Sequence, residues 1–302
     1  MLPGKISCSA GAMSRVTELD ALIDLIASAG YDTIDFWLFR YCSDESCPMW
    51  QDNWREWVTE TRAKIETAGL TVGQVHAWWD HPGQVMEDGS FELPGEIFHR
   101  NIEACRMLGS RKLVFHPIER WHRNTEPEMR QRVLDANVAW FSELLPTAEK
   151  FDVELLIENL FDHKHVQQPG DQPFPCGSAE DVMYVISKIG NPLMKTCLDT
   201  GHANISGQDV ARMARLYGDK LAALHLQDNY GKIGPIYEDL HLLPTCGRIP
   251  WQDVFAALRD IGYEGTRNLE VNAELPRLPE PLRLIHLRTA RELTATLNQL
   301  YG

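Results

Sequence analysis

Short apolar runs alternate with longer amphipathic stretches along the whole chain. From the apolar runs we expect eight strands, at residues 5–10, 31–38, 71–77, 112–116, 154–158, 194–199, 221–226 and 266–271. Most of these runs are continuously apolar, as is typical of parallel strands that are covered on both faces. Between them, residues 50–68 and 126–150 carry apolar side chains at helical spacing, with charged side chains in between.

Glycines close several of the helical stretches just before the next apolar run. They are Gly30, Gly69, Gly109, Gly190, Gly218 and Gly262. Glycine suits the left-handed conformation that often follows the last turn of a helix. The first three are 39 and 40 residues apart, which is the length of one strand–helix unit with its loops. Ser178 stands where it could cap the helix that follows it.

These alternations predict an α/β fold, a (β/α)8 TIM barrel that forms a single domain over residues 1–302. The alternative is a doubly wound open sheet. We favour the barrel because no Gly-x-Gly-x-x-Gly sequence follows an early strand, and because no linker-like segment divides the chain.

Composition and charge bear on whether the protein binds nucleic acid or a membrane, and on its cellular location. A net charge of −14 argues against broad electrostatic binding to nucleic acid. No apolar run approaches the roughly 20 residues that a membrane helix needs, so we expect no membrane partner. The first residues contain no long apolar segment, and the seven cysteines include no Cys-x-x-Cys pair. We therefore expect a cytoplasmic protein with reduced thiols.

Six successive expected strands carry, at or near their C-terminal ends, a side chain that can bind a metal. They are His76, His116, Glu158, Asp199, His225 and Glu270. One such residue alone is more often a hydrogen-bonded core or cap residue, but six at one rim of a barrel indicate a site. Acids that converge in an apolar barrel mouth repel each other unless a cation neutralises them. Carboxylates mixed with imidazoles suit Zn, Mn, Fe or Co, and Mg also remains a candidate.

Three further residues stand near the same rim. The stretch "KTCLDTGHANISG" places His202 three residues after Asp199, so this pair is either a turn device or part of a metal site. In the loop after the seventh strand, Asp239 and His241 are two residues apart and point the same way if the segment is extended. The spacing alone leaves their roles open.

The motifs "LLIEN", "CLDTGHA", "LHLQD", "DLHLLPTCGRIPW" and "NLEV", in this order, resemble the xylose-isomerase-like TIM-barrel superfamily. This superfamily contains sugar isomerases and epimerases and the endonuclease IV type of DNA-repair enzyme. The resemblance covers nearly the whole chain, and its motifs are more specific for the superfamily than for one reaction.

The resemblance to the epimerases implies one divalent metal (Mn, Zn, Co or Mg) held by Glu158, Asp199, His225 and Glu270. Glu158 and Glu270 would also be the catalytic pair. One would take a proton from a carbon next to a carbonyl and the other would return it, while the metal polarises the substrate oxygens. His202 would bind a substrate hydroxyl. The implied activity is that of a sugar or polyol isomerase or epimerase.

The resemblance to endonuclease IV implies three zinc ions instead. Their ligands would be His76, His116 and Glu158 for the first, the four residues above for the second, and His202, Asp239 and His241 for the third. A zinc phosphodiesterase acting on abasic DNA is therefore the main alternative, although the tract after His76 does not look like a DNA-penetrating loop. A lyase or dehydratase acting on a 3-keto sugar and a non-catalytic sugar-binding barrel are the others.

Substrate contacts are expected from Trp37 and Trp78, which stand near strand ends, where aromatic faces can cover a sugar. Packing of helices on the barrel explains such tryptophans equally well. Arg248 lies in "PTCGRIPW", where the sugar enzymes have Gly-Glu-Gly, and could face a substrate anion. The identity of the sugar, its phosphorylation and the formation of a homo-oligomer are left open by the sequence.

Overall fold

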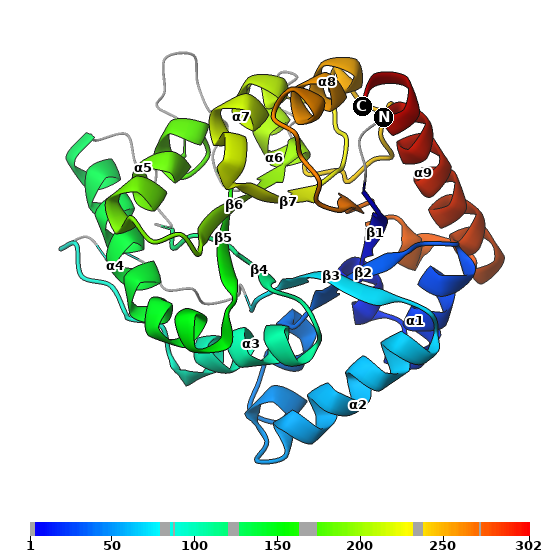
Figure 1. Cartoon of the computed structure of the whole chain (residues 1–302), viewed down its shortest axis with the longest axis horizontal. Coiled ribbons are helices and arrows are strands. Elements are labelled where there is room, and N and C mark those ends of the chain that lie inside the picture. The colour runs from blue at the N-terminus through cyan, green and yellow to red at the C-terminus, as the bar shows by residue number, and fades with distance from the viewer. Residues whose placement is uncertain are drawn as a thin grey trace.

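The computed structural model describes residues 4–78, 85–86, 88–119, 127–162, 174–231, 238–271 and 273–302. Its centre is a ring of eight parallel strands, seen end-on in Figure 1. The strands are β1 (Ile6–Ser9), β2 (Thr33–Trp37), β3 (Thr71–His76), β4 (Lys112–Phe115), β5 (Glu154–Glu158), β6 (Met194–Asp199), β7 (Leu221–His225) and β8 (Arg267–Leu269). Their order in the sheet follows the chain, and β1 pairs with β8.

The last gap in the ring, between β7 and β8, is closed by a bridge between Leu226 and Leu269. The Leu226 backbone N–H donates to the carbonyl of Asn268 at 2.8 Å, and the Glu270 N–H donates to the carbonyl of Leu226 at 3.0 Å. These two hydrogen bonds also fix Glu270 directly beside the end of β7, which places its side chain at the barrel mouth.

Helices surround the ring and cover the outer face of the strands (Figure 1). They are α1 (Leu19–Ser28), α2 (Trp54–Thr67), α3 (Glu96–Met107), α4 (Pro127–Phe151), α5 (Ala179–Ile189), α6 (Thr200–Ile205), α7 (Val210–Tyr217), α8 (Trp251–Asp260) and α9 (Glu280–Tyr301). Short 3₁₀ segments lie at Ala12–Arg15, Phe39–Tyr41, Pro48–Trp50, Gly218–Lys220 and Leu275–Arg277. None of the helices in the described part of the chain is both long and apolar enough to cross a membrane.

The predicted barrel is confirmed, and every predicted strand lies within two residues of the observed one at each end. Ser178 caps α5 as expected, because its hydroxyl accepts a hydrogen bond from the Asp181 N–H. Gly190 then ends α5 in the left-handed conformation, at φ 68°. The helix expected over 50–68 is shorter than predicted, since Pro48–Trp50 forms a separate 3₁₀ turn and α2 begins only at Trp54.

Below the strand ends, the inside of the barrel is lined partly by apolar and partly by polar side chains, and we call this layer the floor of the barrel mouth. Val114, Leu156, Cys197 and Ala223 form a small buried apolar cluster of their own. Each stands two residues before one of the predicted site residues at the ends of β4 to β7, and residues two apart in an extended segment share a face. The floor under β4 to β7 is therefore apolar, whereas β2, β3 and β8 contribute the buried polar residues Asp35, Gln74 and Asn268.

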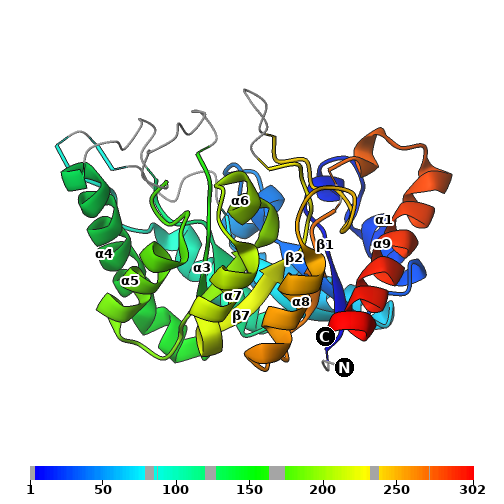
Figure 2. The ribbon, with the colours of Figure 1, turned by 90° about the horizontal axis from the view of Figure 1, so that it is seen from above.

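The two ends of the barrel differ in what they carry. In Figure 2 both chain termini lie on one side of the ring, and α6 lies on the other. Because α6 follows β6 directly at Asp199, its side of the ring is the one where the strands end. The predicted site residues therefore lie at the end away from the termini.

Candidate metal centre

Glu158, Asp199, His225 and Glu270 form one buried cluster at the strand ends. Each offers one ligand atom, and all four of these atoms lie within 4.8 Å of one another. Nδ1 of His225 lies 3.1 Å from Oε1 of Glu158 and 3.2 Å from Oε2 of Glu270. Three carboxylates held this close in a buried place repel each other unless a cation lies among them. Oxygen and imidazole donors of this kind fit a divalent metal.

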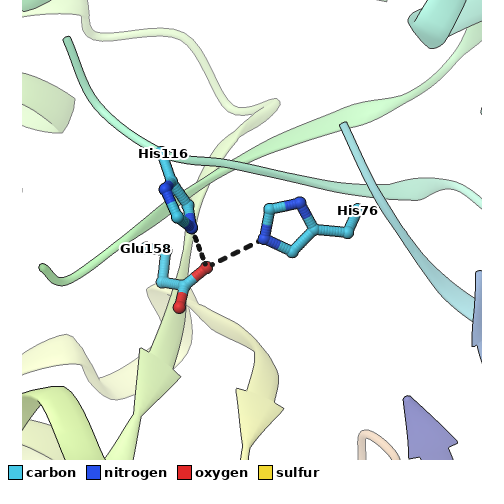
Figure 3. Close-up of side chains that lie close together, drawn as sticks. All are labelled: His76, His116 and Glu158. Atoms are coloured by element: carbon cyan, nitrogen blue, oxygen red, sulfur yellow. Dashed lines mark hydrogen bonds and ion pairs between the residues drawn. The ribbon is translucent and has the colours of Figure 1, made fainter. Parts of the chain in front are cut away.

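Glu158 also belongs to a second group, together with His76 and His116. Nε2 of His76 lies 3.3 Å and Nε2 of His116 lies 3.5 Å from the same oxygen, Oε2 of Glu158. Figure 3 shows the two rings pointing at this oxygen from neighbouring strands. Nδ1 of His76 donates to the carbonyl of Ala77 at 2.9 Å, so in a neutral ring the lone pair of Nε2 faces Glu158. A proton or a cation between the two acceptors would relieve their repulsion.

Asp199 is the N-cap of a helix and also faces the candidate metal centre. As the N-cap of α6, its Oδ1 accepts a hydrogen bond from the backbone N–H of His202 at 2.7 Å. Its Oδ2 lies 4.0 Å from Nδ1 of His225 and faces the cluster. The side chain of Asn159 holds the backbone of Asp199 from both sides, through two hydrogen bonds of 2.9 Å. One carboxylate thus starts a helix and contributes to the candidate metal centre.

Gln227 lies between two of the acids. Its Nε2 donates to Oδ1 of Asp239 at 2.7 Å and to the two oxygens of Asp199 at 3.3 and 3.4 Å. Gly201 makes room for this amide, because a Cβ at position 201 would lie only 2.2 Å from Cδ of Gln227. The glycine of the "DTGH" stretch therefore has a definite task, which is to let Gln227 reach Asp199.

Gly201→Ala is expected to displace the amide of Gln227 and to lower the free energy of unfolding by about 1–2 kcal/mol, the cost of buried hydrogen bonds left unmade. Urea denaturation measures the change. In a Gln227→Ala background the new methyl group has nothing to displace, so there Gly201→Ala should cost little. Equal costs in the two backgrounds would show that Gln227 is not what the glycine accommodates.

His202, Asp239 and His241 meet at one carboxylate oxygen. Oδ2 of Asp239 lies 2.7 Å from Nε2 of His241 and 3.5 Å from Nε2 of His202. The other ring nitrogens are bound to backbone: Nδ1 of His202 donates to the carbonyl of Asn159 at 2.9 Å, and Nδ1 of His241 to that of Glu270 at 2.7 Å. The structure thus brings together the three residues predicted as further metal or substrate ligands. The Nε2 atoms of both histidines face Oδ2 of Asp239.

The two glutamates of the cluster have pKa values that are shifted in opposite directions. Burial alone would raise the pKa of Glu158, but His225 and His116 outweigh it and hold that pKa well below its usual range. Burial raises the pKa of Glu270 to about 7, and the nearby acids Asp199 and Glu158 add to the rise. Two carboxyls with pKa values pushed apart are a common arrangement for one base and one acid.

The histidines also differ. Burial lowers the pKa of His116 to about 4, which leaves its ring neutral and able to bind a metal. Burial would do the same to His241, but Asp239 outweighs it and raises the pKa of His241 to about 10. His241 and Asp239 therefore form an ion pair at neutral pH, whereas His116 stays uncharged.

The predicted substrate-binding residues lie in different surroundings. The ring of Trp37 packs on that of His76, with centroids 4.7 Å apart, so it borders the candidate metal centre. Trp78 stacks on Phe98 at 5.7 Å and meets Trp50 edge-on at 6.3 Å, contacts that a packing role explains. Arg248 is exposed. Contact of Trp37, Trp78, Arg248 and His202 with a substrate stays a prediction.

A comparison with known protein families identifies the family of the chain. A sequence profile described as the xylose isomerase-like TIM barrel matches residues 23–289. The chain belongs to the xylose isomerase-like TIM-barrel family. This confirms the resemblance that the motifs carried.

Relatives with known activities include sugar epimerases. The chain is 30% identical over 256 residues to a D-psicose 3-epimerase of Enterocloster bolteae, which covers 82% of this chain and 75% of that protein. It is 27% identical over 141 residues to a fructoselysine 3-epimerase of Escherichia coli O157:H7, covering 45% of this chain and 46% of that protein.

Solved structures of similar fold include a zinc-bound IolI protein, with a TM-score of 0.73, 18% identity and 99% of each chain covered. A D-tagatose 3-epimerase-like protein has a TM-score of 0.72 and 19% identity, and 98% of each chain is covered. At these identities the two likenesses show the barrel fold alone.

Three polar residues of this family member were missed by the sequence analysis. Asp35 lies on β2 beneath the cluster, Gln227 follows β7, and Asp228 holds the next loop. All three are buried. The motif "LHLQD" contains Gln227 and Asp228, so their position after a strand was a usable signal. Asp35 lies inside a strand run, where no local pattern separates it from a structural residue.

Proposed function

We propose that this protein is a divalent-metal-dependent enzyme that epimerises or isomerises a sugar or polyol by moving a proton next to a carbonyl. The proposal rests mainly on one observation. Glu158 and Glu270 both lie within 3.2 Å of Nδ1 of His225, and together with Asp199 these residues form one buried cluster. The similarity to D-psicose 3-epimerase supports a sugar as the substrate. A cytoplasmic location and self-association stay predictions of the sequence.

The two glutamates are suited to different halves of the reaction. Glu158 has a low pKa and is ionised at neutral pH, so it can accept a proton from the carbon beside the carbonyl. Glu270, with a pKa of about 7, carries a proton part of the time and can return one. They come from β5 and β8, which are separated by β6 and β7. In an epimerisation each would serve one face of the substrate, and the direction of the reaction decides which acts first.

Glu158, Asp199, His225 and Glu270 would hold the metal. When bound, a divalent cation there would polarise the carbonyl and hydroxyl oxygens of the substrate. Trp37 would line one side of the bound sugar, and Nε2 of His202 would bind a substrate hydroxyl in competition with Asp239, 3.5 Å away. The apolar floor of Val114, Leu156, Cys197 and Ala223 keeps water from below the reacting atoms.

Removal of the metal tests the proposal. Protein treated with a chelator should lose at least about 100-fold of its turnover on a panel of ketoses and inososes, because the substrate carbonyl is no longer polarised. Re-addition of Mn²⁺, Co²⁺, Zn²⁺ or Mg²⁺ should restore it. In D₂O the active protein should place deuterium on the carbon next to the carbonyl. Turnover that persists in metal-free protein, or turnover without deuterium uptake, would contradict the proton-transfer mechanism.

A second candidate is a zinc phosphodiesterase acting on abasic DNA. It is favoured by the convergence of His76 and His116 on Oε2 of Glu158, which adds a second group of ligands to the first. Elemental analysis of the same purified protein separates the two. The sugar enzyme requires one ion per chain, whereas three zinc ions together with nicking of abasic duplex would establish the nuclease.

A further inference from the structure

Asp35 lies beneath the candidate metal centre and is fully buried. Its Oδ2 lies 3.5 Å from Nε2 of His225, on the side of the ring that faces away from Glu158 and Glu270. This nitrogen makes no shorter hydrogen bond among the described residues, so the carboxylate of Asp35 is the acceptor placed to receive its proton. The imidazole of His225 therefore has the carboxylates of Glu158 and Glu270 on its Nδ1 side and the carboxylate of Asp35 on its Nε2 side.

The carboxylate of Asp35 is itself held in place by two amides. Nδ2 of Asn268, on β8, donates to its Oδ2 at 2.9 Å, and Nε2 of Gln74, on β3, donates to the same oxygen at 3.4 Å. The pairing of β2 and β3 shifts register between Ile34 and Asp35, and this shift sets Gln74 opposite Asp35. Gly73 occupies the extra position, where a Cβ would lie 2.8 Å from Oγ1 of Thr33. The backbone of the barrel is thus arranged to aim Gln74 at this carboxylate.

The ring of His225 is fixed from its face as well. It stacks on the ring of His76, with centroids 5.6 Å apart and an interplanar angle of 16°. Stacking sets the plane of the ring but does not decide which nitrogen carries the proton. Only an acceptor in the plane of the ring can decide that, and the carboxylate nearest to Nε2 is Asp35.

We propose that Asp35 is a positioning residue of the metal centre: its carboxylate accepts the proton of His225 Nε2 and so presents the lone pair of Nδ1 to the cation. A histidine that binds a metal through one nitrogen commonly donates the proton of the other to a carboxylate or carbonyl, which fixes the ring and makes the ligand more basic. Asn268 and Gln74 orient Asp35 for this task. The inference rests on the proposed metal site and adds a residue to it.

The test is the affinity of the metal-free protein for Zn²⁺, measured by competition with a chromophoric chelator. Asp35→Asn keeps the size of the side chain and removes its charge, and is expected to weaken Zn²⁺ binding by about 10- to 100-fold. Thr33→Val is the matched control, since Thr33 is buried on the same strand two residues earlier and its hydroxyl has no hydrogen-bond partner among the described residues. Its Zn²⁺ affinity should equal that of the unchanged protein.

The melting temperature of each metal-free variant shows whether weaker Zn²⁺ binding comes from loss of folding. If Asp35→Asn does not fold, Asn268→Leu takes its place. This variant removes the amide that makes the shortest hydrogen bond to Asp35. Asn268→Leu is expected to weaken Zn²⁺ binding by at least about threefold, a lower limit set below the effect of losing the carboxylate itself. Zn²⁺ binding unchanged in a folded Asp35→Asn, or in Asn268→Leu if it is used instead, would overturn the role of Asp35. If the unchanged protein does not bind Zn²⁺, Mn²⁺ or Co²⁺, the proposed metal site itself is wrong.

Discussion

Glu158→Gln and Glu270→Gln, made separately, are each expected to lower kcat for sugar epimerisation by at least about a hundredfold. A positioned acid or base contributes roughly 10²–10⁴ to the rate, and a glutamine at either position can neither accept nor return the proton. Glu158→Gln should be the more damaging, because Glu158 also lies within 3.5 Å of a nitrogen of His76, His116, His202 and His225. Steady-state kinetics at saturating metal measure both effects.

Deuterium uptake from D₂O distinguishes the roles of the two glutamates, which a loss of activity alone does not. If each glutamate serves one face of the substrate, a variant that keeps one of them can still exchange the hydrogen on that face with D₂O without inverting the carbon. Each variant should therefore label one epimer and not the other, and the two variants should show opposite preferences. Glu180→Gln, an exposed position on α5, is the control and should be fully active. Full activity in both site variants would rule out the two-glutamate mechanism.

The sequence was sufficient for the strands because most of them are short, mainly apolar runs whose side chains are buried. It was also sufficient for Glu158, Asp199 and His225, which are the last residues of their strands and whose neighbours two residues earlier are apolar. The start of α2 was misplaced for a physical reason. Trp50 and Trp54 are four residues apart and imitate a helical period, but Pro48 begins a 3₁₀ turn there, and Trp50 packs against Trp78.

Asp35 could not be found in the same way. It lies within the run "TIDFW", and its partners are His225 and Asn268, far along the chain. These contacts exist because the barrel closes between β1 and β8 and between β7 and β8, which brings the first strands beneath the last ones. Periodicity records which face a residue occupies, but it carries no information on which distant strand lies across that face.

Asp228 anchors the loop that carries Asp239 and His241. Its Oδ1 accepts hydrogen bonds from the backbone N–H groups of Asn229 and Ile249 at 2.9 and 3.2 Å. Its Oδ2 accepts from the N–H of Thr245 at 3.0 Å and from Nε1 of Trp251 at 2.8 Å. The side chain is fully buried, so one carboxylate satisfies four donors that come from the start and from the end of the loop. Within this loop His241 holds a left-handed backbone, at φ 48°, which a residue other than glycine adopts only at a cost in strain.

Asp228→Ala is therefore expected to lower the free energy of unfolding by about 4 kcal/mol, since several buried donors lose their acceptor at once and only the outer ones regain water. Urea denaturation measures the loss. Trp251→Phe removes one of the four donors and should cost about 1 kcal/mol, while Asp260→Ala, an exposed acid on α8, should cost less than about 0.5 kcal/mol. A loss below about 1 kcal/mol in Asp228→Ala would show that the loop is held by other contacts. If Asp228→Ala lowers the free energy of unfolding by the expected amount, its folded fraction should also turn over more slowly. The reason is that the loop that carries Asp239 and His241 is no longer fixed to the end of β7.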